Sequence, residues 1–374
     1  MQPSKKIRLT KNEAWLIVLP LLLSVIGLVF IYSASYYNAE NTFSDKFYFL
    51  KKQGYAFIVG VFFMFLASKI STEKIEKISP VLYLVSLVLL ALVFVPKIGV
   101  ENYGAKRWLN FGFFTIQPSE IAKFALVCLL SRFASKSDMT SLKNVVLFLL
   151  IGLFVMLLII VEPNMSITVC VGLVVLTLLL LTGASLKHFS FVVFPATLLV
   201  PVLILIEPYR LKRLKAFINP WGDVLGEGYQ LVQSYYALSS GGLFGVGLFN
   251  SRQKFAFLPF AESDFIFAII GEEIGFVGAL FVAMIFLKYV YEGFKVSKRA
   301  VTRFDSYLAM GITLVIAFQS SLNIAVVCGA IPPTGLPLPY VSSGGSSLVS
   351  FLVASGVLLG ISKKAESTQI FLKP

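Results

Sequence analysis

Long apolar runs separated by short polar segments recur along the whole chain. Each run has about 20 residues, the length that an α-helix needs to cross a bilayer. An even number of crossings would put both chain ends on the same side of the membrane. The predicted fold is all-α, a single polytopic membrane domain over 1–374 with about ten spans: 14–34, 52–70, 79–96, 118–134, 143–161, 165–183, 188–206, 264–287, 305–329 and 341–361.

The composition agrees with this pattern. Of the 374 residues, 57% are hydrophobic and only 14% are charged, and the mean hydropathy is +0.85. A soluble domain of this size could not cover its surface with so few polar residues. The basic N-terminal stretch before the first span also resembles a signal peptide, but the run over 14–32 is long for one. We therefore expect an uncleaved first helix.

The distribution of Lys and Arg predicts the orientation. With the N-terminus inside, the cytoplasmic segments hold 19 of them and the outer segments 12. We therefore expect short cytoplasmic tails over 1–13 and 363–374, and one large extracytoplasmic loop over 207–263. The net charge of +13 is then explained by topology and by anionic lipid headgroups, and no nucleic-acid partner is expected.

Cysteine and histidine chemistry is not expected. The three cysteines, Cys128, Cys170 and Cys328, lie in apolar runs without the paired spacing of a zinc site or a disulfide framework. His188 is the single histidine and stands at the start of an apolar run, where a general base is not expected. No metal ligand is predicted.

A first group of polar residues flanks the start of the fourth span. Glu120 and Lys123 are three residues apart, so they share a helix face and can pair within the membrane. This pair is either a structural lock between helices or part of a site. Lys106 and Arg107 beside Trp108 either anchor the chain at the interface or bind a phosphate.

The loop over 207–263 contains basic, aromatic and glycine-rich patches in turn. Its first part, with Arg210 and Arg213, has the pattern of a short amphipathic helix in the membrane interface. The glycine run over 241–247 is not a P-loop, because no Gly-Lys-Ser/Thr sequence closes it. It predicts only tight turns or a close approach of the backbone.

Acidic residues open the eighth span. Asp264 stands where the loop meets the helix, so it either caps this helix or acts in a site. Glu272 and Glu273 follow, about 12–14 Å deeper at the helical rise. They predict either buried hydrogen-bond partners or a path for protons or ions.

A proline-rich, uncharged segment precedes the last span. Residues 333–347 contain three prolines and many small residues, which interrupt helical backbone at membrane depth. Such backbone is tolerated only where it is packed inside protein or lines a polar cavity.

Together these segments resemble the SEDS family (shape, elongation, division and sporulation proteins). The resemblance runs from Tyr32 to the end of the last span, and the segments 219–221 and 250–254 are more similar to the cell-division members than to the elongation members. A sporulation paralogue would look much the same. The motifs that carry the resemblance are Lys106-Arg107-Trp108, Gln117-Pro118-Ser119-Glu120 with Lys123, Gly228-Tyr229-Gln230, Gly245-Val246-Gly247, Asp264-Phe265-Ile266-Phe267, Gly271-Glu272-Glu273-Ile274-Gly275 and the segment 335–347.

The resemblance implies a peptidoglycan glycosyltransferase that polymerises lipid II during septal wall synthesis and releases undecaprenyl pyrophosphate. It implies Asp264 as the catalytic residue, and a carboxylate there could take the proton of the acceptor hydroxyl. Cationic side chains would stabilise the leaving pyrophosphate. The expected substrate-binding residues are Lys106, Arg107, Trp108, Glu120, Lys123, Arg210, Arg213, Gln230, Ser342 and Ser346.

The resemblance also implies partners and a location. Besides lipid II, a class B penicillin-binding protein is expected, together with other divisome or elongasome membrane proteins. The expected location is the bacterial cytoplasmic membrane, with both termini in the cytoplasm. No cofactor is required by the residues, although a divalent cation (Mg²⁺ or Mn²⁺) could replace or assist the cationic side chains.

Three positions depart from the family pattern. Asn164 stands where an aspartate is expected, Phe260 where a glutamate is expected, and Ser343 where a tyrosine is typical. The Asn164 departure bears on any charge or metal role of its loop.

Two other functions compete with the enzyme. A flippase for the lipid-linked precursor would need polar residues through the full depth of the membrane. A scaffold for a transpeptidase would need no chemistry of its own. The enzyme is favoured, because the candidate polar residues gather toward one face of the membrane.

Overall fold

The structure is a computed structural model that describes residues 10–96, 98–102, 105–112, 115–191, 193–195 and 208–372. Long helices dominate it, which confirms the predicted all-α polytopic fold. In the described residues, seven helices are long and apolar enough to cross a membrane. The bundle helices are α1 (Lys11–Phe43), α2 (Tyr48–Ala67), α3 (Thr72–Leu92), α4 (Pro118–Lys136), α5 (Leu142–Val161), α6 (Met165–Leu181), α10 (Ile266–Arg299), α11 (Arg303–Val327) and α12 (Gly345–Leu372).

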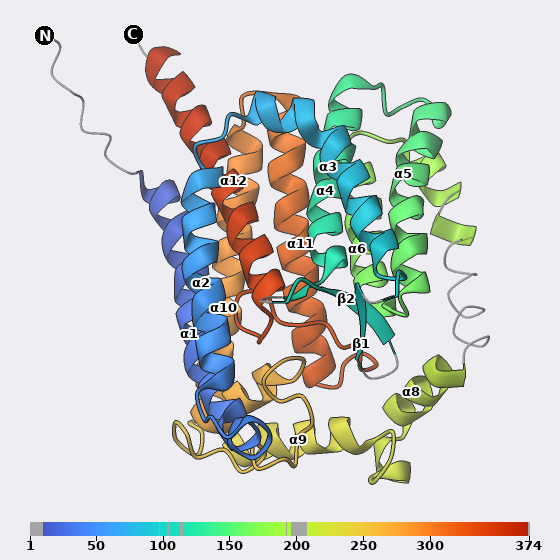
Figure 1. Ribbon diagram of the computed structural model, residues 1–374. Helices are drawn as coiled ribbons and strands as arrows, with labels where there is room; N and C mark the ends of the chain where they lie inside the picture. The colour runs from blue at the N-terminus through green and yellow to red at the C-terminus, as the bar shows by residue number, and fades with distance from the viewer. Residues whose placement is uncertain are drawn as a thin grey trace, which may run out of the picture.

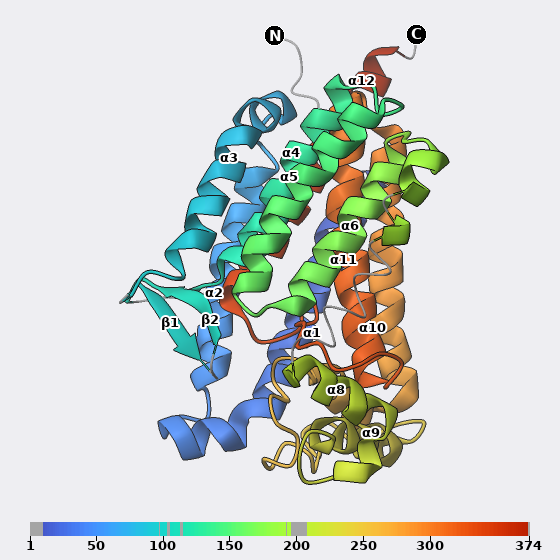
Figure 2. The same cartoon turned by 90° about the vertical axis from the view of Figure 1, so that its right-hand side faces the viewer.

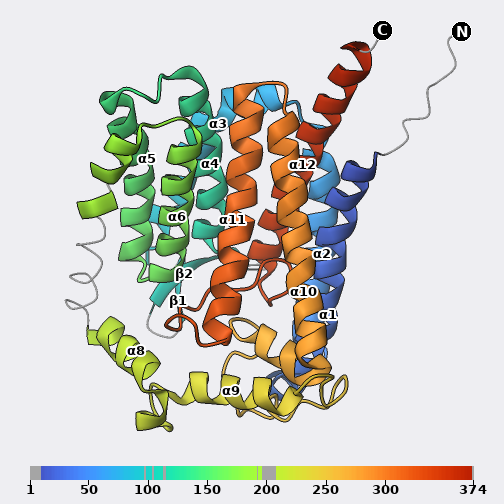
Figure 3. The ribbon, with the colours of Figure 1, turned by 180° about the vertical axis from the view of Figure 1, so that it is seen from behind.

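The bundle has two different ends (Figure 1). The start of α1 and the last turns of α12 lie at one end, which we call the termini end. At the opposite end, the loop end, lie α8 (Pro208–Ile218), the 3₁₀ turn η1 (Pro220–Asp223) and α9 (Tyr229–Gly241), and α9 runs across the bundle rather than along it (Figure 3). The predicted amphipathic helix with Arg213 is therefore present as α8.

The predicted spans agree with the helices to within a few residues at most boundaries. The largest differences are at α1, which continues to Phe43, and at α10 and α12, which continue to Arg299 and Leu372. The span predicted over 188–206 lies mostly outside the described residues. Its described neighbours, the end of α6 and the start of α8, lie at opposite ends of the bundle (Figure 2).

The outside of the bundle is apolar, as the hydrophobic runs predict. Large side chains such as Ile58 and Phe62 of α2, Phe154 of α5 and Phe281 of α10 are more than half exposed. An apolar surface of this extent belongs in contact with lipid tails rather than with water. The chain is a multi-pass membrane protein.

A small antiparallel sheet, which the hydrophobic pattern did not predict, lies at the loop-end side of α3 and α4 (Figure 2). Its strands are β1 (Gly99–Asn102), β2 (Ala105–Asn110) and β3 (Thr115–Ile116), in the order β1-β2-β3. The hairpin of β1 and β2 holds Arg107, whose Nε donates to the Glu162 carbonyl at the end of α5.

Helix α10 is interrupted at Gly275, whose φ of 68° and ψ of −173° are not helical. The interruption leaves unpaired backbone groups on both sides, and residues 242–247 satisfy them. The N–H groups of Phe276 and Val277 donate to the carbonyls of Gly242 and Leu243 at 2.9 and 3.1 Å. In the other direction, the N–H groups of Val246 and Gly247 donate to the carbonyls of Glu272 and Glu273, both at 3.0 Å. The glycine run over 241–247 is thus a cap for two helix ends.

This interruption predicts a stability effect at Gly275. A Cβ at this position would lie 2.4 Å from the Gly245 nitrogen, and the backbone angles are essentially restricted to glycine. We expect Gly275→Ala to destabilise the protein by about 3 kcal/mol and to lower its midpoint of thermal unfolding in detergent. Gly54→Ala is the matched control, because Gly54 lies within α2 with nothing within 4 Å of its Cβ position. Equal midpoints for the two variants would contradict the role of Gly275.

Candidate active site

Asp264 lies in the non-helical turn just before α10, at the loop end, and is half-buried. Its backbone carbonyl accepts a hydrogen bond from Asn323 Nδ2 of α11 at 2.8 Å. Its side chain lies against Gly335, where an added Cβ would come within 3.2 Å of Asp264 Oδ2. The proline-rich segment therefore forms one wall around the carboxylate.

That segment, residues 333–344, is non-helical, and side chains from three helices bind its carbonyl groups. This satisfies backbone that could not otherwise exist at the edge of a membrane. The four bonds are Arg213 Nη1 to the Pro333 carbonyl at 3.0 Å, Asn323 Nδ2 to Leu336 at 2.7 Å, Gln319 Nε2 to Pro337 at 2.9 Å and Gln53 Nε2 to Ser342 at 3.2 Å.

Ser342 and Ser343 join this segment to the residues that precede Asp264. The Ser342 hydroxyl donates to the Ser263 carbonyl at 2.6 Å and accepts from the Leu338 N–H at 2.8 Å. The Ser343 N–H donates to the Glu262 carbonyl at 2.9 Å. Ser342, an expected substrate-binding residue, is therefore occupied in holding the backbone of the Asp264 turn.

The electrostatic environment of Asp264 is unusual for a carboxylate. Burial raises its pKa to about 6, and the guanidinium groups of Arg213 and Arg107 limit the rise. Burial, with a contribution from Asp264 itself, also raises the pKa of Glu262. A carboxylate poised near neutral pH between two fixed cations is the arrangement expected of a general base.

Arg107 lies at an irregularity of the β1–β2 pair. Val100 pairs with Trp108 and Glu101 pairs with Lys106, so Arg107 is the extra residue of a β-bulge, a feature that redirects side chains. Lys106 is exposed and Trp108 is half-buried. Arg107 is half-buried as well, and it binds the segment that follows α5. Its Nε donates to the Glu162 carbonyl at 3.2 Å, and its Nη2 donates to the Pro163 carbonyl.

Glu162, beside Arg107, is a buried acid. Neither carboxylate oxygen has a hydrogen-bond partner within the described structure. Burial raises its pKa to about 8, and Arg107 opposes the rise. Burial thus favours the neutral form of Glu162, and Arg107 donates in this region to two backbone carbonyl groups.

Glu120 and Lys123 form an ion pair inside the bundle, as their spacing predicts. Lys123 Nζ lies 2.9 Å from Glu120 Oε2 and 2.5 Å from Gln319 Oε1, and both charged side chains are almost fully buried. The Ser347 hydroxyl donates to the same Glu120 oxygen at 2.7 Å. The pair therefore connects α4 to α11 and α12 and, through Gln319, to the proline-rich segment.

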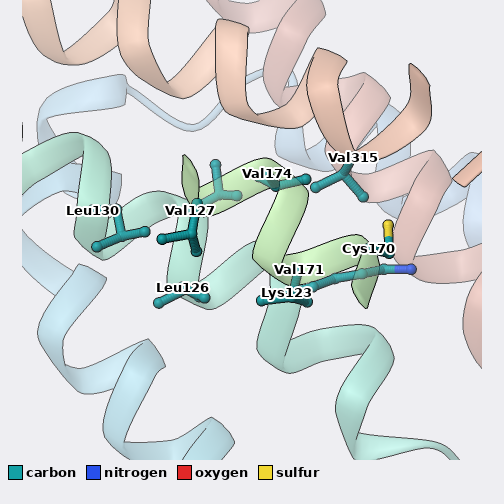
Figure 4. Close-up of a pocket in the computed structure, with 9 residues that line it drawn as sticks. Lys123, Leu126, Val127, Leu130, Cys170, Val171, Val174 and Val315 are labelled. Carbon is teal, nitrogen blue, oxygen red and sulfur yellow. The ribbon is translucent and has the colours of Figure 1, made fainter. Parts of the chain in front are cut away.

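A pocket on the termini side of Lys123 is almost wholly aliphatic (Figure 4). Lys123 is the single charged residue among the nine that line it, and its ammonium group already binds Glu120 and Gln319. This pocket offers nothing that would bind a pyrophosphate. Its other lining residues are Leu126, Val127, Leu130, Cys170, Val171, Val174, Val175 and Val315.

The remaining expected site residues are placed as follows. Ser346 accepts from the Gln117 N–H at 3.3 Å and so joins α12 to the start of α4. Gln230 of α9 donates to the Pro259 carbonyl at 3.5 Å, in the loop that leads to Asp264. The side chain of Arg210 lies outside the described part of the structure. Asp264, Arg107 and Arg213 are brought together, whereas Lys123 is directed into the bundle.

Glu272 and Glu273 have a structural role, the first of their two predicted alternatives. Glu272 accepts from the Arg252 N–H at 2.9 Å and from the Ser251 hydroxyl. Glu273 accepts from the Ser33 hydroxyl at 2.5 Å and lies 3.7 Å from Lys254 Nζ. Both acids therefore hold the loop 251–254 against α1 and α10.

The departures from the family pattern have local explanations. Asn164 caps α6, since its Oδ1 accepts from the Ile167 N–H at 3.4 Å, and asparagine serves this role as well as aspartate. Ser343 contributes its backbone N–H to Glu262, so that bond does not depend on its side chain. The carbonyl of Phe260 accepts from Ser263 and Phe265 in the turn before α10, again through backbone.

Within the described ranges, no three His, Cys, Asp or Glu side chains are grouped as a metal site requires. Glu262 lies two residues before Asp264, and burial raises the pKa of both acids.

Gln53, Gln319 and Asn323 are not among the residues expected from the sequence. The expected residues within the spans are charged or are serines, whereas these three are neutral amides in largely apolar helices. A buried amide needs hydrogen-bond partners just as a charge does, so an isolated Gln or Asn within a span is the signal that would have found them.

The fold and this site define a class, a polytopic membrane protein with a buried acid and two arginines at one end of its bundle. Residues 13–367 match the family of cell cycle proteins formed by FtsW, RodA and SpoVE. The chain belongs to this family, which confirms the resemblance seen in the sequence.

Known relatives are similar over almost their full length. Stage V sporulation protein E of Bacillus subtilis is 39% identical over 362 residues, which cover 95% of this chain and 98% of the relative. A probable peptidoglycan glycosyltransferase FtsW of Geobacter metallireducens is 35% identical over 372 residues, which cover 97% of this chain and 98% of the relative.

Solved structures share the fold. One chain of a peptidoglycan synthase complex, solved to explain how polymerization and crosslinking are coordinated, matches with a TM-score of 0.78 at 26% identity, over 94% of this chain and 97% of that chain. The rod shape determining protein RodA of Thermus thermophilus matches with a TM-score of 0.69 at 25% identity, over 93% of this chain and 96% of that chain.

The buried ion pair predicts a test of the role of Lys123. We expect Lys123→Met to lower the free energy of unfolding by about 3–5 kcal/mol, because it leaves the Glu120 carboxylate buried and uncompensated. The double variant Glu120→Gln/Lys123→Met should recover much of this loss, which thermal unfolding in detergent would measure. If Lys123→Met is as stable as the parent, the ion pair is not what holds α4 to α11.

Proposed function

We propose that this chain is a peptidoglycan glycosyltransferase that polymerises lipid II into glycan strands, at the division septum. Membership of the FtsW, RodA and SpoVE family and relatives named as probable peptidoglycan glycosyltransferases support the enzyme class. The description of the family as cell cycle proteins supports the septal role. The single observation that carries the proposal is the half-buried Asp264 carboxylate with its raised pKa, facing Arg107 and Arg213.

The reaction forms a β-1,4 bond between two lipid-linked saccharides. Asp264 takes the proton from the acceptor hydroxyl, whose oxygen attacks the anomeric carbon of the donor. The bond between that carbon and the pyrophosphate breaks, and undecaprenyl pyrophosphate leaves with the electron pair. Arg107 and Arg213 stabilise the charge on the leaving group, with the exposed Lys106 nearby on β2.

The proposed location is the bacterial cytoplasmic membrane, with the loop end outside and both termini in the cytoplasm. The bias of Lys and Arg toward the segments predicted as cytoplasmic supports this orientation. The start of α1 and the end of α12 lie at the same end of the bundle (Figure 1), as the proposal requires. Asp264 would then meet its substrate on the outer side, where glycan strands are assembled.

A class B penicillin-binding protein is the proposed partner, with other divisome or elongasome membrane proteins around it. The similar chain in a solved peptidoglycan synthase complex supports a partner of this kind. In this proposal the partner carries out the crosslinking.

A flippase is the second candidate, and the distribution of polar groups disfavours it. A flippase needs polar side chains along a route through the membrane. In the described bundle, the charged residues Glu120 and Lys123 neutralise each other, and the pocket on their termini side is aliphatic (Figure 4). The polar side chains around Asp264 lie instead at the loop end of the bundle.

The first test of the proposal is Asp264→Asn in a lipid II polymerisation assay with purified protein in liposomes, with and without the transpeptidase partner. Asparagine has nearly the same size but cannot take a proton, so we expect loss of about 100-fold or more in rate. Glu227→Gln, an exposed acid of the same loop, is the control and should keep the parent activity. An Asp264→Asn variant with full activity would exclude Asp264 as the base.

The raised pKa predicts the pH dependence of the rate. A base acts only when it is ionised, so kcat/KM should fall tenfold per pH unit below about pH 6 and level off above it. Arg213→Ala removes a cation that lowers this pKa, so the midpoint should move to higher pH. Lys215→Ala, an exposed cation of the same helix, should leave the midpoint unchanged. A midpoint near pH 4 in the parent would show that the titrating base is not in this buried environment.

A further inference from the structure

We propose that Gln53, in α2, is a positioning residue that fixes the backbone ahead of Asp264. This inference rests on the proposed glycosyltransferase function. Gln53 is 2% exposed and lies in a helix whose outer face is otherwise largely exposed and apolar. It does not touch the carboxylate, so its effect must pass through the residues that it binds.

Both ends of the Gln53 amide are occupied by the proline-rich segment. Nε2 donates to the Ser342 carbonyl at 3.2 Å, and Oε1 accepts from the Gly344 N–H at 3.0 Å. The Gln53 side chain thus binds the first and the last of three consecutive residues, 342–344, just before α12. Because these backbone groups lie inside the protein, their hydrogen bonds have no water to replace them.

Two of these residues, Ser342 and Ser343, also hold the turn that contains Asp264. The Ser342 hydroxyl binds the Ser263 carbonyl at 2.6 Å, and the Ser343 N–H binds the Glu262 carbonyl at 2.9 Å. A continuous series of hydrogen bonds therefore runs from α2 to the residue before Asp264. From the other side, Asn323 of α11 holds the Asp264 carbonyl itself at 2.8 Å.

The position of the Asp264 carboxylate relative to Arg107 and Arg213 depends on the support from Gln53 and on the support from Asn323. Arg213 is fixed to the Pro333 carbonyl and Arg107 to the Glu162 carbonyl, so neither follows a shift of residues 262–264. Loss of the Gln53 support should misplace the base without removing a group that binds the substrate. The expected signature is a lower kcat at an unchanged KM.

The first measurement is hydrogen–deuterium exchange of the full-length protein in detergent, for Gln53→Met and for Asn12→Leu. Asn12 is the matched control, because it is also a buried amide and binds Ser362 of α12 at 3.2 Å, but at the termini end. We expect faster exchange of the peptide spanning 258–265 in Gln53→Met and parent-like exchange there in Asn12→Leu. Unchanged exchange in Gln53→Met, or faster exchange spread equally over the termini end, would overturn the proposal.

The second measurement is lipid II polymerisation by the same variants. We expect kcat to fall about 10- to 100-fold in Gln53→Met, with KM within twofold of the parent. Gln53→Glu keeps the acceptor for the Gly344 N–H and should lose less, and it replaces Gln53→Met if that variant does not fold. Parent-like kcat in both variants would overturn the positioning role.

A double-variant cycle separates this role from simple packing of α2. In the Ser342→Ala background, the link to Ser263 is already lost, so Gln53→Met should cost clearly less in kcat than in the parent. Fully additive effects would overturn the proposal. If the parent itself makes no glycan from lipid II, the proposed function fails, while the exchange experiment still decides whether Gln53 supports the Asp264 turn.

Discussion

The structure depends on one constraint, the need to satisfy backbone polar groups where the helices are interrupted near the membrane. Residues 333–344 cannot form a helix because of their prolines, and lipid offers no hydrogen bonds in exchange. Side chains of α2, α8 and α11 take over this role, with Gln53, Arg213, Gln319 and Asn323 binding four carbonyl groups. The segment is thereby fixed, and it in turn forms a wall around Asp264.

The same constraint explains the second interruption, in α10. Residues 242–247 bind the free backbone groups on both sides of Gly275, so the helix can change direction without unpaired groups. Glu272 and Glu273, at the interruption, bind the loop 251–254. Two irregular segments, each held by hydrogen bonds from neighbouring elements, therefore lie on either side of the turn that contains Asp264.

The charged residues inside the bundle and those at the loop end differ in their surroundings. Inside the bundle, Glu120 and Lys123 neutralise each other and hold three helices together. At the loop end, the guanidinium groups of Arg107 and Arg213 limit the rise of the Asp264 pKa, and each also donates to a backbone carbonyl group. An acid with a pKa of about 6 near two cationic side chains has the properties that the proposed proton transfer needs.

The sequence predicted most of the described helices and the family, because hydropathy and local motifs are properties of contiguous residues. The role of Asp264, which opens the eighth predicted span, stays a prediction. The sequence did not predict the β1–β2 hairpin that orients Arg107, since Gly99–Asn110 has no clear alternating pattern. It also left open whether Lys123 binds a substrate or Glu120. That choice depends on Gln319 and Ser347, which lie about 200 residues away in the chain and whose proximity no local pattern reveals.

The arrangement of the supports also has a consequence for biosynthesis. The cap of α10 joins residues close in sequence, so the loop end can fold as soon as that helix has been inserted. The Asp264 turn, in contrast, is also held by residues 342 and 343, which a ribosome delivers only after α10 and α11. In a nascent protein, the Asp264 turn would therefore have its bond to Asn323 of α11 before the bonds from residues 342 and 343, and its final geometry would be fixed only when the segment before α12 is in place.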